Sequence, residues 1–314
     1  MRASLSTHRY WNAVRFVVLA ALWGGTFPAV TVGLESFPPI LYAALRLYLG
    51  AALLLLYVMW AFDYWLPREP RDWLAVCAGG VLTLAGYSVL QNVGQQIVPS
   101  AIASVLTGLI PILTIGFATV LLPEERFGAS EASGVAIGFI GVVVITRPDP
   151  SSLLAGDTVG QGILVLAGVS FALGGILTQW ANTKMPSAPR TAWAMLLGAG
   201  LTHLASIASP NESWRLVQLS PEGLIALAYL GVFVSAVGYL IYFALLPQLG
   251  SVELNLVTYA IALFGAVFSS LLFADPVTVS TLGGFALILL GFGLLKRDEL
   301  YMAYREYGIG FETE

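Results

Sequence analysis

The sequence has few of the residues on which enzymes, metal sites and disulfide-stabilised domains depend. Its 314 residues include one cysteine, two histidines and only 10% charged residues, whereas a soluble domain carries about 25% charged residues. The single cysteine, Cys77, excludes an intramolecular disulfide and a cysteine-rich metal site, and we expect it to be a small core residue. No cofactor and no bound metal are expected.

Catalytic side chains are equally scarce. The histidines are His8 and His203, and the two lysines, Lys184 and Lys296, fall outside the long apolar segments. An intramembrane hydrolase would need paired aspartates, a Ser/His or Ser/Lys dyad, or a zinc-binding histidine pair at membrane depth. A retinal-type photoreceptor would need a lysine there, and no glycine-rich loop leads to the Lys-Ser/Thr pair of a nucleotide-binding site. An enzyme is therefore not expected.

What the chain has instead is apolar sequence. Hydrophobic residues make up 58% and the mean hydropathy is +0.83, which places the protein in a lipid bilayer. A spanning helix needs about 20 mostly apolar residues. Ten segments meet this description, and their approximate limits are 14–33, 38–62, 73–98, 101–122, 131–146, 159–182, 189–208, 223–246, 252–273 and 279–295. The predicted fold class is an all-α integral membrane protein with ten transmembrane helices.

An internal repeat divides these segments into two sets of five. Residues 100–127 align without a gap to residues 251–278, which pairs Ser104 with Asn255 and Thr107 with Thr258. With one residue of slip, the match extends to the glycine-spaced segments that begin at residues 134 and 284, and to the Gly-Tyr pairs 86–87 and 238–239. In a hydrophobic protein such a repeat is typical of a transporter with its site between two related halves.

The positions of the basic residues predict the orientation. With the amino terminus inside, eleven of the 14 basic residues fall on the internal side: Arg2, Arg9, Arg15, Arg68, Arg71, Arg126, Lys184, Arg190, Lys296, Arg297 and Arg305. Because each half has an odd number of helices, the second half enters the membrane from the opposite side and the repeat is inverted. We predict a cytoplasmic segment 1–13, a first half 14–147, a second half 158–297 and a cytoplasmic tail 298–314.

Several short motifs carry a family resemblance. They are Trp23-Gly24-Gly25-Thr26-Phe27, Ala43-Ala44-Leu45-Arg46, Pro111, Glu124-Glu125 and Ile145-Thr146-Arg147-Pro148. With these motifs in this order, the chain resembles the EamA-type branch of the drug/metabolite transporter superfamily. The resemblance implies two inverted five-helix halves, both termini in the cytoplasm of a prokaryotic cell, and transport of small metabolites, often amino acids, across the plasma membrane. Export is the favoured direction, the partners are a small solute and the bilayer, and a monomer or weak homodimer is expected.

Polar side chains within the apolar segments predict the solute site. Tyr87, Gln91 and Gln95 follow one another at helical spacing and form one polar stripe. Uncharged amide, hydroxyl and aromatic groups can bind and release a small polar solute. We therefore expect a cavity walled by the third, fourth, eighth and ninth helices. The predicted substrate-binding residues are Trp23, Arg46, Tyr87, Gln91, Gln95, Thr107, Tyr239, Tyr242, Asn255, Thr258 and Tyr259.

Arg46 has two interpretations. It lies about two turns inside the second helix, where a charge is costly unless it faces protein, water or a partner. It either binds a carboxylate of the solute, or it has a structural role in which it caps neighbouring carbonyls or extends towards the outer surface. The coupling ion also stays open, with Glu131, Glu253, Asp275 and His203 as the candidates and structural roles as the alternative.

Glycine spacing suggests how the molecule moves. Gly134, Gly138 and Gly141 lie on one face of the fifth helix, and Gly284 and Gly291 repeat the outer two positions on the tenth. Small residues allow close helix packing, so these helices are expected to be scaffolds against which the others rock in alternating access. The alternative to a transporter is a non-transporting membrane scaffold or receptor.

Overall fold

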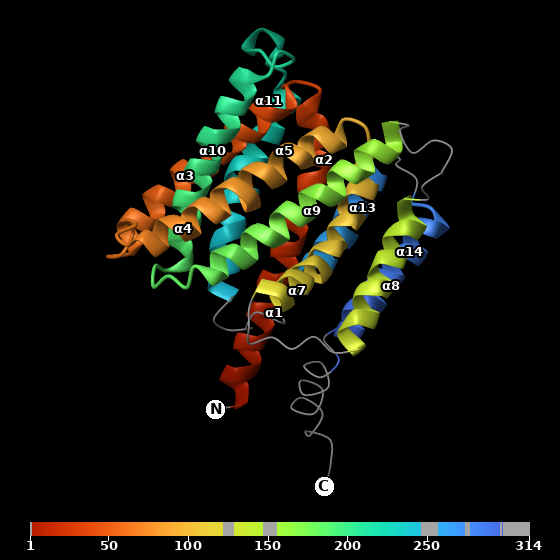
Figure 1. The fold of residues 1–314 in the computed structure, drawn as a ribbon. Helices are drawn as coiled ribbons and strands as arrows, with labels where there is room; N and C mark the ends of the chain where they lie inside the picture. Colours follow the sequence, from red (N-terminus) through yellow and green to blue (C-terminus); the bar gives the residue numbers. More distant parts are fainter. Residues whose placement is uncertain are drawn as a thin grey trace.

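The computed structural model describes residues 2–121, 129–146, 156–245, 257–273, 277–295 and 297, and its regular structure there is helical (Figure 1). The predicted all-helical class is confirmed. Seven helical stretches are long and apolar enough to cross a membrane, and two shorter apolar helices follow them. The seven are Trp11–Leu34, Pro39–Ala61, Pro70–Gln95, Ser100–Ala118, Thr158–Trp180, Ser187–Ala208 and Pro221–Leu245. The shorter two are Val257–Phe273 and Val279–Gly291.

Within these stretches the helices change type at several points. The first part of the chain contains α1 (Arg2–Gly24), α2 (Thr26–Leu34), α3 (Pro39–Ala61), α4 (Pro70–Ala78), the π-helix η1 (Gly79–Gly86), α5 (Tyr87–Gln95), α6 (Ser100–Leu106), the 3₁₀ turn η2 (Thr107–Leu109), α7 (Ile110–Leu121) and α8 (Ala129–Thr146). The second part contains α9 (Gly156–Trp180), α10 (Ser187–Ala208), the 3₁₀ turn η4 (Trp214–Leu216), α11 (Pro221–Ala228), the π-helix η5 (Tyr229–Val237), α13 (Val257–Phe273) and α14 (Val279–Leu295).

Proline sets several helix starts. Pro39, Pro70 and Pro221 occupy the first turn of α3, α4 and α11, where the missing N–H costs nothing and the fixed φ suits a helix. These prolines explain why the predicted limits of the corresponding segments lie within three residues of the observed ones. The first predicted span, 14–33, also lies within three residues of the observed span Trp11–Leu34, although α1 itself begins earlier, at Arg2.

Two long helices carry a π-helical segment at the same place. The stretch Pro70–Gln95 contains η1 and the stretch Pro221–Leu245 contains η5, and each π-segment ends at a Gly-Tyr pair. A glycine of another helix lies against each. A Cβ on Gly25 would be 2.2 Å from Tyr229 Oη in η5, and a Cβ on Gly174 would be 2.4 Å from Thr83 Oγ1 in η1. Glycine is therefore required where α9 meets η1 and where the start of α2 meets η5.

Helix pairing joins the two parts of the chain. The helix from α4 to α5 packs against α9 and α10, and the helix that contains α11 and η5 packs against α2 and α3. Helix α3 also packs along α10, and α8 along α14. In Figure 1 the α8–α14 pair lies at one side of the molecule, beyond α7 and α13. Neither part of the chain therefore buries its helices alone.

The α8–α14 contact is reciprocal. A Cβ on Gly141 of α8 would be 2.6 Å from the Gly284 carbonyl oxygen of α14, and a Cβ on Gly291 of α14 would be 2.5 Å from the Gly134 carbonyl oxygen of α8. Gly138 faces a side chain instead, since its Cβ would meet Ile112 Cδ1 at 2.2 Å. The glycines predicted to form smooth faces thus bring these two helices into backbone contact with one another.

A buried carboxylate ties the start of α4 to the loop between α9 and α10. The side chain of Asp72 accepts hydrogen bonds from the Tyr64 hydroxyl (2.6 Å), from the backbone N–H groups of Arg68 and Glu69 (2.8 and 2.9 Å), and from the Thr183 hydroxyl. The hydrogen bond to Asp72 raises the pKa of the Tyr64 hydroxyl to about 12. This cluster holds the two parts of the chain together at one end of the helices.

One expectation from the sequence is wrong, and several others concern residues that the structure does not describe. Cys77 is exposed on α4 rather than buried in a core, because the buried side of that helix is formed by Asp72, Ala75 and Val76. Glu124, Glu125, Glu253, Asn255, Asp275 and the tail 298–314 lie outside the described residues.

Candidate functional site

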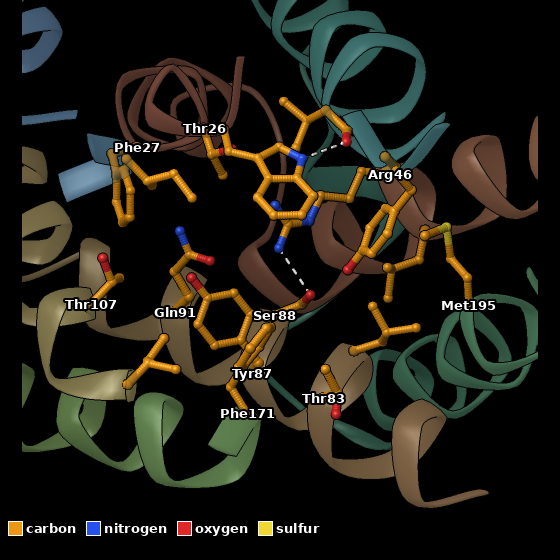
Figure 2. A pocket seen from close by; sticks show the side chains of 18 of the residues that line it. Thr26, Phe27, Arg46, Thr83, Tyr87, Ser88, Gln91, Thr107, Phe171 and Met195 are labelled. Atoms are coloured by element: carbon orange, nitrogen blue, oxygen red, sulfur yellow. Dashed lines mark hydrogen bonds between the residues drawn. The ribbon is translucent and has the colours of Figure 1, made fainter. Parts of the chain in front are cut away.

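A cavity of about 140 Å³ lies inside the helix assembly. Taking roughly 30 Å³ for one liquid water molecule, it has room for about five waters or a small solute. Its walls come from both parts of the chain (Figure 2): Trp23, Thr26, Phe27, Arg46, Leu47, Thr83, Leu84, Tyr87, Ser88, Gln91, Thr107, Ile110, Phe171, Met195, Val234, Ser235, Tyr239, Thr258 and Ile261.

A second cavity of about 290 Å³ continues from the first and shares Trp23, Thr83 and Tyr239 with it. It extends to Ser187 and Arg190 at the start of α10. Its lining is Trp23, Ala75, Gly79, Thr83, Leu84, Phe171, Gly175, Thr178, Ser187, Arg190, Thr191, Ala194, Tyr239, Tyr242, Phe243, Val257 and Thr258. Together the cavities form a passage from the interior towards the end of the protein where α10 begins.

Arg46 is the charged side chain of the inner cavity. It is 5% exposed, one guanidinium nitrogen donates to Ser88 Oγ at 2.9 Å, and Nε is buried without a hydrogen-bond partner. Figure 2 shows the hydrogen bond from the Arg46 guanidinium to Ser88, with Tyr87 close by. The titratable groups that interact with it are the hydroxyls of Tyr42, Tyr87 and Tyr239. Arg46 thus neither caps carbonyls nor reaches the surface, which were the structural alternatives.

Two buried amide side chains form a hydrogen-bonded chain beside the inner cavity. Gln91 is 1% exposed and donates through Nε2 to Gln95 Oε1 at 3.0 Å, and Gln95 donates to the Phe27 carbonyl at 3.0 Å. The acceptor oxygen of Gln91 has no partner. A buried acceptor without a partner is costly, so Gln91 offers a vacant hydrogen-bonding position beside the cavity.

Aromatic rings form much of the remaining wall. Trp23 lies edge-on to Tyr239 and stacks with Tyr242, at centroid distances of 5.3 and 5.7 Å. Tyr87 meets Phe171 edge-on at 5.2 Å. The Trp23 indole N–H donates to the Val234 carbonyl in η5 at 3.0 Å. The hydrogen bond to η5 therefore holds the Trp23 ring, which lines both cavities, in place.

At the end of the molecule opposite the start of α10, Glu212 lies in the loop between α10 and α11. Its carboxylate accepts from the backbone N–H groups of Ile40 and Leu41 at 2.7 and 2.8 Å, and from Ser206 Oγ at 2.9 Å. It therefore caps the start of α3, where a negative charge is favourable. Ser36 and Ser220 add a hydroxyl–hydroxyl hydrogen bond of 2.6 Å at this end.

The structure brings most of the predicted site residues together. Those that line the inner cavity are Trp23, Arg46, Tyr87, Gln91, Thr107, Tyr239 and Thr258, and Tyr242 lines the outer one. Gln95 and Tyr259 are buried but line neither cavity, and Asn255 lies outside the described residues. The walls include α2, α3, α9 and α10 as well as the predicted helices, so the predicted walls were incomplete.

Ser88, Phe171 and Arg190 were missed as cavity residues. Ser88 is one residue from Tyr87 and falls off the predicted stripe, but it is the hydrogen-bond partner of Arg46. In the sequence, Phe171 is an ordinary apolar residue of its segment. Arg190 contributes to the excess of basic residues on the internal side and carries no further signal of a cavity. A helical projection that placed Ser88 beside Gln91 could have found the first of these. Among the described residues, no group of three or more His, Cys, Asp or Glu could hold a metal.

The fold and the cavity define a polytopic membrane protein with an internal solute-sized site. Residues 11–147 and 158–296 each match the EamA-like transporter family, so the chain belongs to that family, within the drug/metabolite transporter superfamily. It is a family of transporters rather than enzymes.

Relatives cover most of the chain. The uncharacterized transporter YvbV of Bacillus subtilis is 26% identical over 91% of both chains. The uncharacterized inner membrane transporter YedA of Escherichia coli K12 is 27% identical over 73% of this chain and 72% of its own. A crystal structure with 20% identity and a TM-score of 0.65 covers 91% of this chain and 96% of its own, which shows a shared fold.

Proposed function

We propose that this chain is a secondary transporter that exports small metabolites, amino acids or related polar solutes, by alternating access. The observation that carries the proposal is the buried, polar and aromatic cavity lined by both family-matched segments, which continues towards one end of the protein. At the other end, Glu212 joins the loop before α11 to the start of α3. A scaffold or receptor has no need for such a passage.

The architecture we propose is ten helices in two inverted five-helix halves. Three features support it: the π-segments at corresponding places before Gly-Tyr pairs, the glycine contacts on each π-segment from the other half, and the reciprocal Gly141–Gly284 and Gly291–Gly134 contacts. In the last of these, the Gly141–Gly284 contact is repeated as the Gly291–Gly134 contact, because residues 134 and 141 are the repeat counterparts of residues 284 and 291. Such reciprocity is expected of two halves related by a pseudo-two-fold axis.

Orientation then assigns the conformation. The distribution of basic residues places the start of α10 and its Arg190 at the cytoplasmic side. The passage extends to that side, and Glu212 closes the external side. We therefore infer an inward-facing state of a plasma-membrane carrier with cytoplasmic termini, ready to receive a solute from the cell.

Replacing Gln91 and Asn255 together with leucine is expected to lower the rate of solute efflux from proteoliposomes about tenfold or more. The change removes the vacant acceptor of Gln91 and the amide of Asn255, which the sequence repeat pairs with Ser104. One or two lost hydrogen bonds of about 1.5 kcal/mol each give this factor. The readout is loss of a pooled set of amino acids and nucleobases from loaded vesicles.

Gln218→Leu is the matched control, because Gln218 is exposed in the loop before α11. It should export at the parent rate. Unchanged rate and affinity in the Gln91→Leu, Asn255→Leu variant at normal expression would remove the cavity from the transport path. No loss of any solute from parent vesicles would favour a scaffold or receptor.

A further inference from the structure

We propose that the cavity selects solutes that carry a carboxylate next to an apolar or aromatic body, and that Arg46 binds the carboxylate. This inference rests on the proposed transport function. Among the described residues that line either cavity there is no aspartate and no glutamate. The two charged side chains in those walls are both arginines, Arg46 deep inside and Arg190 towards the end of the passage.

The first step concerns the unbalanced charge of Arg46. Among the described residues, its hydrogen-bond partner is one serine hydroxyl, its Nε is unpartnered, and the titratable groups beside it are tyrosines rather than carboxylates. A buried charge without a counter-ion is expensive, and membrane proteins keep one where it acts on a substrate or ion. A carboxylate bound to the planar guanidinium supplies the missing negative charge.

The second step concerns the rest of the solute. Trp23, Tyr87, Phe171 and Tyr239 give the inner cavity apolar ring surface around Arg46. The unpartnered oxygen of Gln91 accepts an N–H or O–H, and the ring faces also attract an ammonium group. An α-amino acid thus finds a partner for each of its groups. An amine without a carboxylate is repelled by the positive charge of Arg46.

The third step concerns entry. Arg190 is half-buried in the outer cavity, where its guanidinium donates to Ser187 Oγ at 3.5 Å. Its charge lies on the same passage as that of Arg46, because the two cavities share Trp23, Thr83 and Tyr239. Charges of one sign in a low-dielectric cleft concentrate ions of the opposite sign. Anionic solutes are therefore concentrated at the Arg190 end, and a zwitterion entering there is oriented with its carboxylate towards the arginines.

The test compares two matched pools loaded into proteoliposomes: a mixture of neutral L-amino acids, and the primary amides of the same amino acids. Protein-free vesicles give the leak to subtract. We expect parent vesicles to lose the amino acids at least about tenfold faster than the amides, in line with the cost of a missing partner for a buried charge. A third pool of 2-hydroxy acids should also be lost, because it keeps the carboxylate and lacks only the ammonium group.

Variants assign the effect to Arg46. Arg46→Gln should slow amino-acid efflux about tenfold or more, Arg46→Lys should retain part of it, and Arg215→Gln in an exposed loop should export at the parent rate. Amides leaving as fast as amino acids, or Arg46→Gln at the parent rate, would overturn the carboxylate assignment and leave transport standing. Retention of every pool by the parent protein would contradict transport itself. If Arg46→Gln does not fold, the comparison of the amino-acid and amide pools in the parent protein tests the carboxylate assignment by itself.

Discussion

Replacing Glu212 with alanine is expected to make the inner cavity reactive from the external side of the membrane. In the structure this carboxylate accepts three hydrogen bonds, from Ile40 N–H, Leu41 N–H and Ser206 Oγ, and so joins the loop before α11 to the start of α3. Losing a helix cap of this kind costs about 1–2 kcal/mol, and the loss falls on the closed external end. The equilibrium between inward- and outward-facing states shifts towards the latter.

The measurement uses a cysteine at Thr83, which lines both cavities, in a protein whose exposed Cys77 has been changed to serine. A membrane-impermeant maleimide applied from outside should label it about tenfold faster in Glu212→Ala than in the parent. Glu222→Ala is the matched control, because Glu222 is an exposed carboxylate in the first turn of α11 at the same end. Equal labelling in parent and Glu212→Ala would show that this contact does not close the external side.

Replacing Gly141 with leucine should slow turnover about tenfold or more and change solute affinity far less. A Cβ at this position already meets the Gly284 carbonyl oxygen at 2.6 Å and the Ile288 backbone nitrogen at 3.0 Å, so a side chain pushes α8 and α14 apart. Overpacking of a close contact costs about 1–3 kcal/mol. The cavity residues lie on other helices, so the binding site keeps its groups.

Two comparisons sharpen this prediction. Gly138→Leu should have a smaller effect, because its nearest neighbour is the end of the Ile112 side chain, which can move. Gly293→Ala is the control on α14, since nothing lies within 4 Å of a Cβ there. Efflux rates and half-saturation concentrations, measured together, separate turnover from affinity. If Gly141→Leu exported at the parent rate, the α8–α14 contact would have no part in the conformational change.

The sequence was sufficient for the helices but not for their irregularities. Apolar length and proline placement predicted the segments that became α3, α10 and α14 to within a few residues. The π-segments η1 and η5 were not predicted, because a π-helix has no amino-acid composition of its own. Gly25 and Gly174 of other helices pack against these segments.

The residues of the cavity were also predicted only in part. Polarity at membrane depth predicted Arg46, Tyr87, Gln91 and Tyr239, since such residues have few other reasons to be there. It did not predict that Gln95 would bond to the Phe27 carbonyl instead of facing the cavity. Phe171 could not be found by polarity at all, because it contributes only ring surface. Which face of a helix meets the cavity depends on how the two halves dock, and that is a property of the whole fold.

The most direct test of the carrier account is the dependence of efflux on internal solute concentration in vesicles that contain one protein each. The account predicts slow, saturable release of the neutral amino-acid pool, because every transported molecule requires the closed end to open and the passage to close. Flux at channel-like rates, or flux that stays linear up to very high solute concentration, would contradict it.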